Sequence, residues 1–124
     1  MIIRKKQAAY LGMTQFIRRF RDLLWENYPD SKKIARETLD GFIQQQLEKA
    51  HAYGLRTEHA IGMYVLVAWQ LGDGFDERFP VIKERLSRTD WDNEIKAYWL
   101  QTFTLDFLQR LEQGDGGGPG NGLV

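Results

Sequence analysis

The chain has 124 residues and is 43% hydrophobic, which fits one domain with a single core. Four Trp, five Tyr and seven Phe exclude a disordered chain, and the absence of cysteine excludes disulfides, thiolate metal sites and cysteine nucleophiles. The formal net charge is zero, and no apolar stretch has the length of a signal peptide or a membrane span. We therefore expect a cytoplasmic protein.

The charge is divided unevenly along the chain. Residues 1–36 hold nine Lys/Arg against three Asp/Glu, whereas residues 37–124 hold eight against fourteen. Such a division can steer a charged partner toward one end of the molecule. It can equally be satisfied internally, if basic N-terminal helices lie against acidic later ones, and both interpretations stay open.

Two amphipathic helices are expected in the first half of the chain. The first begins near Thr14 and carries apolar residues at spacings of three and four until Pro29 ends it. The second has Asp30 or Ser31 as its cap and follows the helical period as far as Gly54. Gly54 is expected in the left-handed conformation that commonly ends a helix.

The third expected helix, residues 57–71, is the central one. Thr57 is its expected N-cap, and its apolar residues leave almost no polar face. A helix of this kind is surrounded by other helices. Gly72 and Gly74 bring it to an end.

Two further helices complete the expected fold. Pro80 opens a short helix at its first position, and Thr89 or Asp90 caps a long one. The sequence thus predicts an all-α bundle of about five helices over residues 1–113. Residues 114–124 are rich in glycine and are expected to form a flexible tail.

The sequence lacks a set of residues that catalysis would require. Glu48 and His51 have the spacing of half a di-iron motif, but no second copy is present. Glu58 favours the dipole at the start of its helix without any further role. The segment 72–76 fits neither a phosphate-binding loop nor a calcium-binding loop. We therefore predict a protein that is not an enzyme and that uses no metal or cofactor.

Binding to another protein is the function that remains after this elimination. The first candidate surface is the basic side of the first helix, and the second is the loop that follows the third helix. The candidate binding residues are Arg18, Arg19, Arg21, Asp73, Phe75 and Asp76.

Nucleic-acid binding is a further alternative, because positive charge is concentrated in one third of the chain. Against it stand a pI of about 6.7 and the lack of a helix-turn-helix or RNA-binding signature. The residues concerned are Arg4, Lys5, Lys6, Arg18, Arg19, Arg21, Lys32, Lys33 and Arg36. Membrane binding is not expected, because the apolar stripe of the first helix is needed for the core.

Residues 52–86 contain a series of helix ends and starts in a specific order. The segments are Tyr53-Gly54-Leu55, Thr57-Glu58, Leu71-Gly72, Phe75-Asp76 and Phe79-Pro80. This order resembles a group of small helical bacterial proteins that are encoded beside PAAR-type or toxin genes in type VI secretion clusters. The resemblance implies an adaptor or co-chaperone for a secreted effector or a PAAR/spike component, or alternatively an immunity protein that neutralises a cognate toxin. It supplies no catalytic residues.

Overall fold

The structure is a computed structural model that describes the backbone of residues 2–117 and the side chains of residues 12–113. The described residues form helices and no strand, which confirms the all-α prediction. The elements are α1 (Ile2–Asn27), the 3₁₀ helix η1 (Pro29–Lys33), α2 (Arg36–Ala52), α3 (Glu58–Leu71), α4 (Phe75–Arg78), α5 (Pro80–Leu86) and α6 (Asn93–Gly117). None of these helices combines the length and the apolar composition needed to cross a bilayer.

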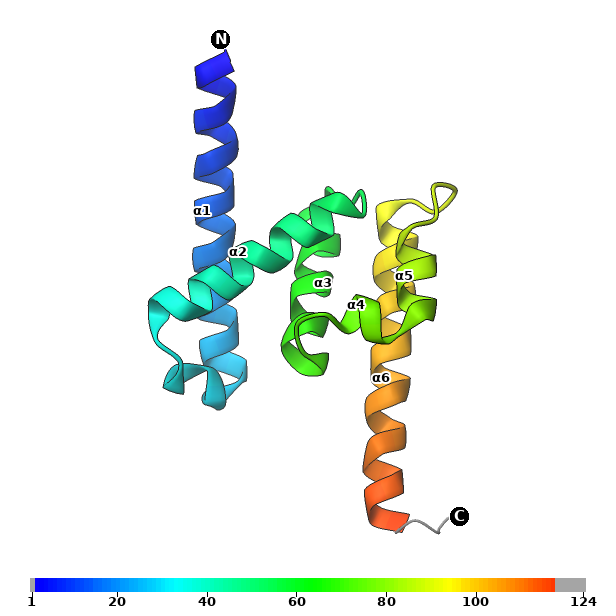
Figure 1. The fold of residues 1–124 in the computed structure, drawn as a ribbon. Coiled ribbons are helices and arrows are strands. Elements are labelled where there is room, and N and C mark those ends of the chain that lie inside the picture. Colours follow the sequence, from blue (N-terminus) through cyan, green and yellow to red (C-terminus); the bar gives the residue numbers. More distant parts are fainter. Residues whose placement is uncertain (1, 118–124) are drawn as a thin grey trace.

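The helix α3 lies in the middle of the molecule, as its composition predicts. It packs against α2 on one side and against α6 on the other. Figure 1 shows α1 and α2 crossing on one side of α3, with α5 and α6 on the other side. The N-terminal half of α1 and the C-terminal half of α6 extend beyond the other helices in opposite directions (Figure 1).

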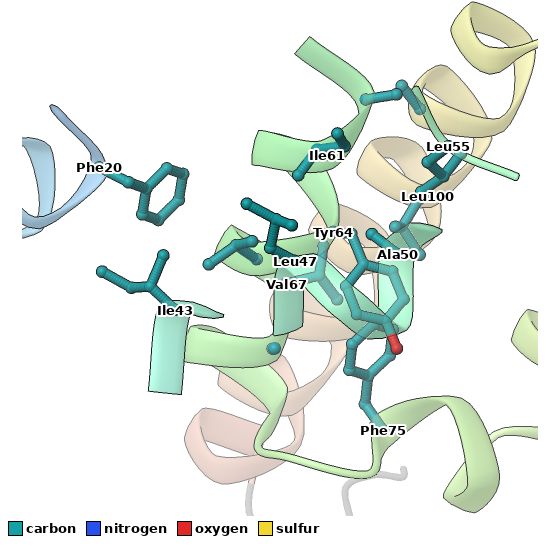
Figure 2. Packing of buried hydrophobic residues seen from close by; sticks show 14 of the residues in the cluster. Phe20, Ile43, Leu47, Ala50, Leu55, Ile61, Tyr64, Val67, Phe75 and Leu100 are labelled. Carbon is teal, nitrogen blue, oxygen red and sulfur yellow. The ribbon is translucent and has the colours of Figure 1, made fainter. Parts of the chain in front are cut away.

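The hydrophobic core is built around α3. Tyr64 of α3 is fully buried, and its ring centroid lies 4.8 Å from that of Phe75. Figure 2 shows these two rings side by side, with Phe20 of α1, Leu47 of α2 and Leu100 of α6 among the surrounding core residues. Side chains from helices far apart in the sequence therefore hold α3 in place.

The turn between α2 and α3 has the geometry that its sequence predicts. Gly54 has φ 86°, and its N–H donates to the carbonyl of His51 at 2.9 Å. The N–H of Leu55 donates to the carbonyl of Ala50 at 3.1 Å, so the two bonds together form a Schellman motif. The Thr57 hydroxyl oxygen then caps α3, because it accepts a hydrogen bond from the N–H of Ala60.

The predicted starts of the first two helices are wrong. The backbone of α1 is helical from residue 2, twelve positions before Thr14. Neither Asp30 nor Ser31 caps α2, because the residues after Pro29 form the 3₁₀ turn η1, in which the Ser31 hydroxyl donates to the Tyr28 carbonyl at 2.7 Å. Ile34 is extended, and α2 begins only at residue 36.

The last part of the chain also differs from the expectation. An additional one-turn helix, α4, precedes α5, so residues 2–117 form six α-helices where about five were expected. Asp90 does not cap α6, because its carboxylate binds Arg88. The carboxylate of Asp92 accepts the capping bond from the N–H of Ile95 at 2.9 Å instead. The backbone of α6 is helical to Gly117, and the rest of the glycine-rich segment, residues 118–124, lies outside the described residues.

Candidate protein-binding groove

The three arginines predicted on α1 have different surroundings. Arg18 is exposed and has no partner among residues 12–113. Arg19 forms an exposed ion pair with Glu58 at the start of α3. Arg21 is only 7% exposed, and its Nη1 atom lies 2.8 and 2.7 Å from the two carboxylate oxygens of Asp40 on α2. Only Arg18 and Arg19 are thus placed to contact a partner.

Two of the predicted loop residues are part of the interior. Phe75 is fully buried and cannot contact a partner in this conformation. Asp76 is 6% exposed and accepts a hydrogen bond from the hydroxyl of Tyr53 at 2.6 Å. These contacts attach the one-turn helix α4 to α2 and α3.

Asp73, the third predicted loop residue, is half-exposed but already engaged. Its carboxylate accepts hydrogen bonds from Lys49 Nζ at 2.7 Å and from Gln46 Nε2 at 2.9 Å. The bond from Lys49, followed by that from Gln46, holds the pKa of the Asp73 carboxyl below its ordinary value. The loop after α3 is therefore tied to α2, and its charge is partly compensated within the molecule.

A large hollow in the described surface lies beside α1. Its volume is about 880 Å³, and a second hollow of about 390 Å³ follows it along the same helix. Both hollows are lined by Phe16, Arg19 and Glu58, so they form one groove that the Arg19–Glu58 ion pair crosses. We call this the α1–α3 groove. It follows α1 from Gly12 to Leu23.

The lining of the α1–α3 groove is mainly apolar. Met13, Phe16 and Ile61 belong to the first hollow, and Leu23 and Met63 belong to the second. Leu23 is 42% exposed although it lies on the same helix as the core residues. Uncovered apolar surface of this kind, bordered by polar residues, commonly marks a place where another protein binds.

Charged residues stand at the border of the groove. Arg56 is exposed, and its Nη1 atom donates to the carbonyl of His51 at 2.9 Å. Arg19 and Glu58 have side chains that are 58% and 60% exposed. An ion pair so exposed contributes about 1 kcal/mol or less. A ligand that enters the groove can therefore displace this ion pair at a small cost in free energy.

The sequence predicts that the entire apolar stripe of α1 lies in the core, so this groove is not expected from the sequence. A signal was present in the adjacent residues Leu23 and Leu24, which point about 100° apart on a helix. Leu24 is fully buried, so Leu23 faces outward. The residues of the half di-iron motif, Glu48 and His51, also line the groove. Within residues 12–113, no three His, Asp or Glu side chains gather as metal ligands would.

Comparison of the chain with protein-family models, with curated proteins and with solved structures finds no match in any of the three.

Proposed function

We propose that the protein is an accessory factor that binds another protein in the α1–α3 groove and does not catalyse a reaction. The observation that carries this proposal is the mainly apolar lining of the two hollows between Gly12 and Leu23, which meet at the Arg19–Glu58 ion pair. Burial of apolar surface is the main driving force of protein association. A partner that covers this lining would gain that free energy.

The dimensions of the groove suit an amphipathic helix. Gly12 and Leu23 are eleven positions apart on α1, which corresponds to about 17 Å, or about three helical turns. A partner helix of that length can place apolar residues at positions i, i+3 or i+4, and i+7 in the two hollows. The ion pair of Arg19 and Glu58 lies between the hollows, where such a helix would cross it.

The basic surplus in the first third of the chain favours an acidic partner. Arg19 lines the groove, whereas Arg18 is not one of its lining residues and has no partner among the described side chains. Residues 1–36 as a whole carry six more basic than acidic residues. We therefore expect the apolar face of the partner helix to be flanked by Asp or Glu. The engagement of Arg21 with Asp40 leaves less free basic surface for nucleic acid.

The class of partner is suggested by the resemblance of residues 52–86 to proteins encoded in type VI secretion clusters. On that basis the partner would be an effector or a PAAR/spike component, and the protein would act as an adaptor or co-chaperone. An immunity protein would use the same kind of contact but would neutralise its partner. Survival of cells that express the partner toxin distinguishes the two roles.

Co-expression with effector and spike proteins of type VI secretion clusters tests this proposal. Leu23→Asp places a charge in the groove at a position that is 42% exposed, so folding should be retained. Val81→Asp is the matched control, since Val81 is 38% exposed and lies on α5 away from the groove. We expect wild type and Val81→Asp to co-purify with one of these proteins, and Leu23→Asp to bind it about tenfold or more weakly. Equal binding of the two variants, or no complex with any of these proteins, would contradict the proposal.

A further inference from the structure

A separate cavity of about 540 Å³ lies on the other side of α3, between the α2–α3 turn and the loop that joins α5 to α6. Tyr53 and Gly54 line it from the turn, Arg88 and Trp91 from the loop, and Lys96 from α6. The α1–α3 groove contains none of these residues. This cavity is therefore independent of the proposed protein-binding surface.

Lys96 is the unusual residue of this cavity. It is only 6% exposed, and its Nζ atom donates to the carbonyl of Tyr53 at 3.0 Å. An ammonium group has three donors, and within residues 12–113 this one has a single acceptor and no carboxylate partner. Burial without a counter-charge lowers the pKa of Lys96. Buried charges in proteins are normally paired. Among the described residues, Lys96 therefore has an unpaired positive charge and two hydrogen-bond donors that are available to a ligand.

The other cation of the cavity is already compensated. Arg88 Nε and Nη2 lie 3.0 and 2.7 Å from the two carboxylate oxygens of Asp90, and Arg88 Nη1 lies 3.6 Å from Glu84. These two carboxylates repel an anion in proportion to its charge, so they disfavour a ligand with two negative charges more than a ligand with one. The uncompensated charge is thus the single charge of Lys96, which matches a ligand with one negative charge.

The remaining lining defines the rest of the ligand. Trp91 offers an aromatic ring, and a cavity of this volume falls in the range of small-molecule sites. We propose that the cavity binds a small organic monocarboxylate, whose carboxylate accepts hydrogen bonds from Lys96 Nζ and whose apolar body lies against Trp91. The same carboxylate chemistry occurs in free organic acids and at the C-terminus of a peptide.

The proposal is tested by following backbone amide resonances of the whole protein during titration with three probes. The probes are N-acetyl-phenylalanine, its uncharged amide, and inorganic phosphate. We expect saturable shifts at Gly54, Trp91 and Lys96 with the acid only. The affinity of a peptide that ends in a free carboxylate is compared with the affinity of N-acetyl-phenylalanine. The tighter binder shows whether the cavity prefers a peptide C-terminus or a free organic acid. Absence of saturable shifts with the acid, equal binding of the amide, or tighter binding of phosphate would overturn the proposal.

Two lysine variants test the role of the ammonium group. Lys96→Met keeps the apolar stem and removes the charge, and we expect it to weaken binding of the acid by about tenfold or more. Lys83→Met is the matched control, because Lys83 on α5 pairs with exposed Glu77, and neither residue lines the cavity. Leu23→Asp in the α1–α3 groove should also leave acid binding unchanged. Unaltered affinity of Lys96→Met for the acid would overturn the proposal. If Lys96→Met fails to fold, the comparison of acid and amide binding to the wild type tests the proposal instead.

Discussion

Arg18 and Arg21 lie three positions apart on α1 but differ in their contribution to stability. Arg21 is 7% exposed, binds Asp40 and places its guanidinium carbon 5.3 Å from the ring centroid of Trp25. We expect Arg21→Ala to lower the free energy of unfolding by about 2 kcal/mol, because it leaves a half-buried carboxylate without its partner. Arg18→Ala should change that free energy by less than about 0.5 kcal/mol. Urea denaturation measures both, and equal losses would show that Arg21 has no such structural role.

The carboxylate of Asp73 makes the free energy of unfolding depend on pH in the acidic range. Hydrogen bonds from Lys49 and Gln46 lower its pKa below the ordinary value of 3.8. Its contribution is therefore complete above the pKa of the unfolded chain and is lost as the pH falls through the lower pKa of the folded state. We expect the free energy of unfolding to fall less steeply between about pH 5 and pH 2 in Asp73→Asn than in wild type. Identical slopes would contradict this assignment.

At the scale of single elements, the helix α2 contains a glycine that its packing does not require. Gly41 is exposed, and a Cβ atom built there meets no atom within 4 Å. Gly41→Ala should therefore raise the free energy of unfolding by about 0.5–1 kcal/mol. Gly54→Ala provides the contrast, since φ 86° forces an alanine into the left-handed region and should destabilise the protein by about 1 kcal/mol or more. Thermal denaturation of the two variants should give shifts of opposite sign.

The ends of the helices could be predicted from the sequence where a capping residue or a glycine determines them locally. Thr57 and Gly72 bracket α3, and Gly54 ends α2 through bonds within its own turn. The η1 and α4 segments were missed because a single helical turn has no periodicity to detect. Asp90 was mistaken for a cap because its actual partner, Arg88, could not be recognised from residue type alone.

At the scale of the whole molecule, the candidate site could be predicted only in part. The sequence predicts Arg19 as a binding residue, and the structure places it in the lining of the groove, but Asp73 and Arg21 are engaged by residues of α2. Such pairings depend on how helices cross, which one sequence does not specify. The groove lies between α1 and α3, and Phe16, Phe20 and the exposed Leu23 line it from α1.

The basic and acidic parts of the chain meet in the folded molecule without cancelling completely. The ion pairs of Arg19 with Glu58 and of Arg21 with Asp40 join α1 to α3 and α2. Arg18 stays free among the described residues. Both interpretations of the charge division therefore have a basis in the structure.

Photo-crosslinking with the co-expressed partner tests the location of binding most directly. A photoreactive phenylalanine derivative at exposed Gln15 lies in the α1–α3 groove, and the same group at exposed Gln101 on α6 is the matched control. We expect covalent attachment to a partner helix from Gln15 and none from Gln101. Attachment from Gln101 alone, with a stable complex present, would contradict the assignment of the α1–α3 groove as the binding site.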